Sequence, residues 1–122
     1  MASYVSDATL NQAVDAITDQ TIQVRAHSGP PGSTGTANRI GTASVDHPAA
    51  EWSDGSGGVS ETTVDSELGV LDSANRQTVT HYSLFAGTTF LLWADLASPV
   101  TIGAGQSFTI SRGTVEVRVT RP

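Results

Sequence analysis

Apolar side chains in the first twenty residues repeat with the period of an α-helix. They fall at positions i, i+3, i+4 and i+7, which are Leu10, Ala13, Val14 and Ile17. Ser6 is a residue type that caps helix N-termini, and the β-branched residues that follow Asp19 disfavour further helix. The pattern therefore predicts a helix within residues 1–20, whose apolar stripe packs against a larger element.

Apolar and polar residues alternate between turn sequences in the rest of the chain, which is typical of β-strands. Candidate strands lie at residues 21–26, 40–45, 59–64, 67–71, 78–86, 89–96, 100–102, 107–111 and 114–120. We expect segments 78–86 and 89–96 to be neighbouring antiparallel strands, which could lie at the centre of a sheet. The spacing predicts a mainly β fold, an antiparallel β-sandwich or barrel-like domain of about seven strands with one N-terminal α-helix, in a single domain over residues 1–122.

Residues 27–38 differ in composition from both neighbouring segments. They hold three glycines spaced three residues apart and two prolines, a combination that favours turns over strand ladders. We predict a Gly/Pro surface loop here. Loops on rigid β-scaffolds often carry binding contacts, so this loop and the helix stripe are the candidate assembly contacts. The candidate residues in the loop are Pro30, Pro31, Gly32, Ser33, Thr34 and Gly35.

The charge balance is acidic, with 12 acidic and six basic side chains and a net charge of −6. Nucleic-acid binding needs clustered positive charge, so we expect no nucleic-acid partner. No apolar segment approaches the roughly 20 residues of a membrane span, and the N-terminus lacks the charged start of a signal peptide. We therefore expect no membrane partner and synthesis in the cytoplasm. The absence of cysteine excludes disulfides and thiolate chemistry.

The candidate chemistry is sparse. The three histidines, His27, His47 and His81, have no ligand spacing for a metal, and a hydrolase triad with Asp46 or Asp95 lacks a Gly-x-Ser-x-Gly nucleophile motif. The Asp-Gly-Ser-Gly-Gly sequence at residues 54–58 resembles half of a calcium loop, but the later glutamate ligand is missing. We predict a protein that is not an enzyme and that has no catalytic residue, metal site or cofactor.

The low charge suits a surface that is buried in an assembly. Only 15% of residues are charged, whereas 30 of the 122 residues are serine or threonine. Charged residues are depleted at the centres of protein interfaces, where their desolvation is costly. The composition therefore favours a structural role over catalysis.

The order of elements resembles that of short virion structural proteins from tailed phages that infect Actinobacteria. A helix over residues 7–17 leads into the strand at 22–27 and the loop at 31–38, and the strand at 79–85 is followed by a glycine and the apolar strand at 89–93. The end of the chain, with segments 98–102 and 105–110 before a valine-alternating strand, is also similar. Residues 43–75 match no motif of that family. Six arginines with no lysine indicate a GC-rich genome, which agrees with such a host.

The resemblance implies a non-enzymatic virion protein. Our first hypothesis is a minor capsid or decoration protein on the outside of the capsid, whose partners are the major capsid protein and copies of itself. The alternative is a minor tail or tail-fibre-associated protein that contributes to host adsorption, and only then do we expect a glycan partner, bound through Trp52, Trp93 or Tyr82. Because large aromatic residues are mostly buried, we expect both tryptophans to be core residues rather than exposed platforms.

Overall fold

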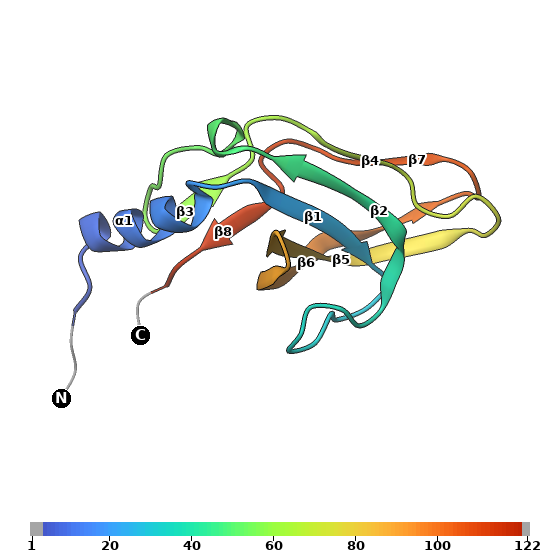
Figure 1. The fold of residues 1–122 in the computed structure, drawn as a ribbon, viewed down its shortest axis with the longest axis horizontal. Coiled ribbons are helices and arrows are strands. Elements are labelled where there is room, and N and C mark those ends of the chain that lie inside the picture. Colours follow the sequence, from blue (N-terminus) through green and yellow to red (C-terminus); the bar gives the residue numbers. More distant parts are fainter. Residues whose placement is uncertain (1–3, 121–122) are drawn as a thin grey trace.

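The computed structural model describes residues 4–120 (Figure 1). The helix α1 spans Asp7–Thr18, and the Ser6 hydroxyl caps it by accepting a hydrogen bond from the Thr9 backbone N–H at 3.2 Å. The predicted helix is thus confirmed, and residues 1–3 of the predicted segment lie outside the described residues.

The rest of the described chain is mainly β-strand, as the alternation predicts. The strands are β1 (Ile22–His27), β2 (Arg39–His47), β3 (Val59–Glu61), β4 (Ser66–Val70), β5 (Gln77–Ala86), β6 (Thr89–Ile102), β7 (Ser107–Ile110) and β8 (Glu116–Arg118). A short 3-10 helix, η1 (Ala49–Glu51), follows β2. The mainly β class with one N-terminal helix is confirmed.

Four strands form the largest sheet, in the order β2-β1-β5-β6 with antiparallel neighbours. The apolar stripe of β1 faces the core through Ile22, Val24 and Ala26, all fully buried. Strands β5 and β6 are neighbours, as predicted, but only β5 is central. Strand β6 forms one edge of the sheet, because the described chain places no strand on its other side.

Two shorter ladders, β3–β8 and β4–β7, complete a sandwich-like arrangement (Figure 1). One hydrophobic core joins the inner face of the main sheet to these ladders. Its members include Val24, Leu84, Phe108, Val115 and Val117. The valine alternation at the C-terminal end places Val115 and Val117 in this core, as the sequence pattern predicts.

Helix α1 packs on the short β3–β8 ladder (Figure 1). Leu10 and Val14 of its apolar stripe are buried. The backbone N–H of Gly58 donates to the Asn11 side chain at 2.9 Å, which ties the glycine-rich turn to the helix. Leu10 and Val14 are thus used inside the fold, whereas Ala13 is exposed and Ile17 is partly buried, so assembly contacts through the helix stay a prediction for these two residues only.

Several strand boundaries differ from the predicted ones, and local contacts explain those of β6 and β3. Strand β6 continues through Pro99, whereas the sequence suggested a break before residue 100. Between the pairs His81–Asp95 and Val79–Val100, four residues of β6 bulge opposite Thr80. Pro99 is one of these four, so its missing N–H interrupts no regular hydrogen bond between the strands. Strand β3 ends early at Glu61. The Thr62 N–H still donates to the Val115 carbonyl at 3.0 Å, and the Thr63 N–H then turns to the Glu51 carbonyl at 2.9 Å.

Candidate functional site

The predicted surface loop connects β1 to β2 and closes on itself through backbone hydrogen bonds. The Ser28 N–H donates to the Asn38 carbonyl at 2.9 Å, and the Ala37 N–H donates to the Pro31 carbonyl at 2.9 Å. In Figure 1 the loop projects from the end of β1 below the main sheet. It is an ordered part of the fold.

The six candidate residues of the loop divide into two groups. Pro30, Ser33 and Thr34 are exposed, and we call these three residues the loop crest. Gly32 is partly buried, while Pro31 and Gly35 are buried. Of these six residues, only those of the loop crest are therefore placed to contact another molecule.

Gly35 fixes the loop against the main sheet. Its φ of +72° is favourable for glycine and strained for other residues, and a Cβ at this position would overlap the Phe90 ring of β6. The glycine is needed both for its conformation and for the close approach. The loop therefore covers part of the outer face of the sheet, the face opposite the core.

His27 links this loop to the centre of the sheet. Its Nδ1 lies 2.8 Å from the Ala37 carbonyl, and its Nε2 lies 2.7 Å from the Ser83 hydroxyl. A carbonyl oxygen can only accept, so Nδ1 carries the proton and Nε2 accepts from Ser83 in the neutral ring. Burial lowers the pKa of His27, and the nearby charges of Arg39 and Arg25 lower it further. The buried ring is thus held neutral.

Aromatic side chains continue across the outer face beside the loop. The Arg25 guanidinium lies 3.7 Å above the centre of the Phe85 ring, and Phe85 and Phe90 have ring centroids 5.4 Å apart. Next to them, Trp93 of β6 lies edge-on against His81 of β5, with ring centroids 5.5 Å apart. The outer face of the main sheet thus carries more aromatic side chains than the alternation of apolar and polar residues in the sequence indicates.

The three aromatic residues considered for glycan contact have different environments. Trp52 is 6% exposed and Tyr82 is 2% exposed, so both are core residues. The Tyr82 hydroxyl accepts a hydrogen bond from the Glu116 N–H at 3.2 Å, and burial raises its pKa. Trp93 is 40% exposed. The expectation of a buried residue is confirmed for Trp52 and wrong for Trp93, because Trp93 points to the outer face of an edge strand.

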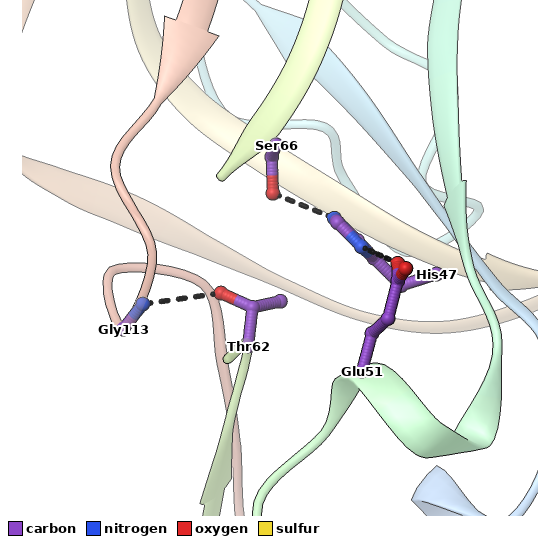
Figure 2. Close-up of polar contacts among 5 residues, drawn as sticks. All are labelled: His47, Glu51, Thr62, Ser66 and Gly113. Atoms are coloured by element: carbon purple, nitrogen blue, oxygen red, sulfur yellow. Dashed lines mark hydrogen bonds and ion pairs between the residues drawn. The ribbon is translucent and has the colours of Figure 1, made fainter. Parts of the chain in front are cut away.

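Figure 2 shows an arrangement of three side chains that has the connectivity of a catalytic triad. His47 Nδ1 lies 2.8 Å from a Glu51 carboxylate oxygen, and His47 Nε2 lies 2.8 Å from the Ser66 hydroxyl. Neither Asp46 nor Asp95, the acids considered from the sequence, takes part in this arrangement. The geometry links the end of β2 to η1 and β4.

Burial opposes nucleophilic chemistry at this arrangement. Ser66 is fully buried within β4, so its hydroxyl cannot reach a substrate in this conformation. The Gly113 N–H, the backbone donor drawn nearby in Figure 2, is hydrogen-bonded to Thr62. A nucleophile needs access and a free oxyanion donor. We therefore interpret the His47–Glu51–Ser66 arrangement as a structural link.

Two surface hollows of about 470 Å³ each lie near this link. One lies between α1 and the segment after η1, and its lining includes Asp15, Asp19 and Asp54. The other is lined by His47, Glu51 and further acidic residues. Within residues 4–120, no three acidic or histidine side chains are grouped so that they could hold a metal ion. In the same part of the chain, no helix has the length and apolar character needed to cross a membrane.

The sequence matches a protein family over residues 1–118, nearly the whole chain. The family is described as podophage GP4 fiber I protein gp80. The chain belongs to this fibre protein family. It is therefore a phage virion structural protein, as the resemblance implies. No curated protein matches the sequence.

The description of the gp80 fibre family favours the alternative hypothesis over the first one. Its description names a fibre, which agrees with the tail-associated alternative better than with capsid decoration. The match also includes residues 43–75, which share no motif with the virion proteins that the rest of the sequence resembles. The description names no bacterial host, so an actinobacterial host stays a prediction from the resemblance, with which the arginine bias agrees.

Two features of this fibre-family chain were missed by sequence reasoning. The link of His47, Glu51 and Ser66 joins positions up to 19 residues apart on three elements, and no spacing rule connects them. The second feature is the free edge of β6. The richness of segment 89–96 in apolar residues indicated a central strand, but it could also have signalled a strand that has a partner outside the chain.

Proposed function

We propose that this chain is a non-enzymatic structural component of the tail fibre, or of the region where the fibre attaches. The observation that carries the proposal is the match of residues 1–118 to a phage fibre family. Under this proposal its main structural partners are fibre proteins, and the major capsid protein is not a required partner. The small size and the β-rich fold suit a compact module within a larger appendage.

The absence of catalysis is part of the proposal. Ser66 is the hydroxyl placed against a histidine and a carboxylate in Figure 2, and it is fully buried. The other buried histidine, His27, is likewise bonded to a buried serine, Ser83. Both histidines thus connect elements of the fold. These contacts support a structural role.

A contribution to host adsorption is the second part of the proposal. Of the three aromatic residues considered for glycan contact, only Trp93 has substantial exposure. Sugar rings stack on exposed aromatic faces, whereas a buried ring offers no such surface. Glycan contact under this proposal therefore falls to Trp93 and not to Trp52 or Tyr82.

The location can be tested on purified virions. The band of this chain is quantified against the major capsid protein, and antibody against the chain is located on the particle by electron microscopy. We expect a small number of copies and labelling at the tail. A copy number comparable to that of the capsid subunits, with labelling over the head, would contradict this proposal and support the capsid-decoration hypothesis.

A further inference from the structure

Strand β6 leaves backbone hydrogen-bonding groups without a neighbouring strand. It pairs with β5 on one side, and no strand of residues 4–120 pairs with it on the other. On a free edge, alternate N–H and C=O groups point outward, where they can pair with another chain. The opposite edge strand of the sheet, β2, packs beside β4, so β6 is the more open of the two edges.

The side chains of β6 lack the usual protection of a free edge. Of its 14 residues only Asp95 is charged. Charged side chains are a common means of preventing an edge strand from pairing with another chain. Trp93 and Val100 are each 40% exposed. An apolar hollow of about 240 Å³ adjoins the strand, and its lining includes Leu96, Val100, Phe108 and Ile110.

Two irregularities set the length of edge that can be paired. One bulge lies at Leu91, between the pairs Leu84–Leu92 and Phe85–Phe90, and the other begins after Asp95. The regular part runs from Leu92 to Asp95. Because bulges interrupt pairing, they confine an added strand to a short contact. A short, bounded contact suits a closed pair of chains rather than an open stack of sheets.

We propose that two copies of this chain pair through β6, antiparallel and about a twofold axis at Ala94. In this register Ala94 lies opposite Ala94 of the second copy and Trp93 lies opposite Asp95, so the contact stays within the regular part of the strand. Side chains then stay on matching faces, since Trp93 and Asp95 pair with Ser83 and His81 on the outer face. The two Asp95 carboxylates do not face each other.

Charge places the contact between two copies on this edge. The chain carries a net charge of −6, so two copies repel each other over most of their surfaces. Strand β6, with a single charged residue, is a surface on which this repulsion is small. A basic partner would instead be attracted to the acidic surfaces elsewhere. The twofold contact uses one patch twice, which requires no other partner.

The chain has no cysteine, so a single introduced thiol reports the register directly. In antiparallel pairs, opposite Cα atoms lie about 4.5 to 5.5 Å apart, within the range that a disulfide spans. We expect Ala94→Cys to form a disulfide-linked dimer under mild oxidation. Thr89→Cys, on the same strand but five residues from the axis, and Val70→Cys, at a 44% exposed site on β4, are the controls and should stay monomeric.

A second pair of variants tests the same register without relying on Ala94. Trp93→Glu places a carboxylate opposite Asp95 of the other copy, whereas Trp93→Lys places an ammonium there. By sedimentation velocity of the purified chain, we expect Trp93→Glu to dissociate roughly tenfold more readily than Trp93→Lys, since two such pairs occur per dimer. Circular dichroism confirms that each variant is folded.

The outcomes separate this inference from the proposed function, because both experiments use the purified chain without phage or host. A wild-type chain that is monomeric at all concentrations overturns the inference, and so does a dimer that crosslinks through Val70→Cys or Thr89→Cys but not through Ala94→Cys. Equal dissociation of the two Trp93 variants also overturns it. Loss of glycan contact would affect both variants alike, since both remove the indole.

Discussion

Gly35 decides how the loop after β1 lies on the sheet. Its φ of +72° and its contact with Phe90 both exclude a side chain, whereas Gly87 in the β5–β6 turn has a φ of +60° with open space around it. We expect Gly35→Ala to lower the free energy of unfolding by about 1 to 3 kcal/mol more than Gly87→Ala, the excess arising from overpacking. Urea denaturation of both variants measures this difference. Equal losses would mean that the loop moves away without cost.

His27 makes the fold sensitive to acid. Burial lowers its pKa in the folded protein below the ordinary value of 6.5, so the unfolded chain binds a proton first as the pH falls. Stability is therefore full above about pH 6.5 and declines below it, until the pH reaches the folded pKa. Nitrogen-15 NMR of the imidazole should show the Nδ1–H tautomer and a titration below pH 6.5.

The variant His27→Gln isolates this effect in unfolding experiments. It removes the titrating group, so we expect a smaller loss of unfolding free energy between pH 7 and pH 5 than in the wild type. Thr78→Gln, at an exposed position of β5 that carries no titrating group, is the control and should keep the wild-type slope. A His27 ring that titrates at or above pH 6.5 in the folded protein would contradict the argument.

At the scale of elements, the loop crest is the exposed part of the six candidate residues in the loop after β1. Deleting the whole loop would also remove Pro31 and Gly35, which are buried against the fold. We therefore expect the double variant Ser33→Glu and Thr34→Glu to keep the wild-type melting temperature and to reduce incorporation into virions. Thr88→Glu, in the exposed β5–β6 turn, is the control. Normal incorporation of the double variant would exclude the crest as an assembly contact.

Elements whose signals are local could be predicted from the sequence. The cap and apolar spacing of α1 and the valine alternation around β8 depend on neighbouring residues, and the structure confirms both. The edge position of β6 and the contact of His27 with Ser83 depend on which strands pair, and residues 27 and 83 are 56 positions apart. Apolar alternation has the same form in a central strand and in an edge strand that meets another chain. The sequence pattern therefore could not distinguish the two.

At the scale of the whole molecule, the distribution of charge governs self-association. The net charge of −6 opposes the approach of a second copy, while the proposed contact through β6 is nearly free of charge. Added salt screens the repulsion and leaves apolar and backbone contacts largely unaffected, since the screening length is about 10 Å at 0.1 M. We therefore expect the dissociation constant of the dimer to fall several-fold as salt is raised from about 20 to 300 mM.

The variant Trp93→Lys gives this salt dependence a control. Its ammonium group lies opposite Asp95 of the second copy in the proposed register, so salt weakens an attraction there while it screens the overall repulsion. We expect a smaller fall in its dissociation constant than in the wild type, measured by sedimentation equilibrium over the same salt range. A wild-type dimer that weakens with salt would show instead that ion pairs hold the copies together. Strand β6, with one charged residue, could not then be the contact.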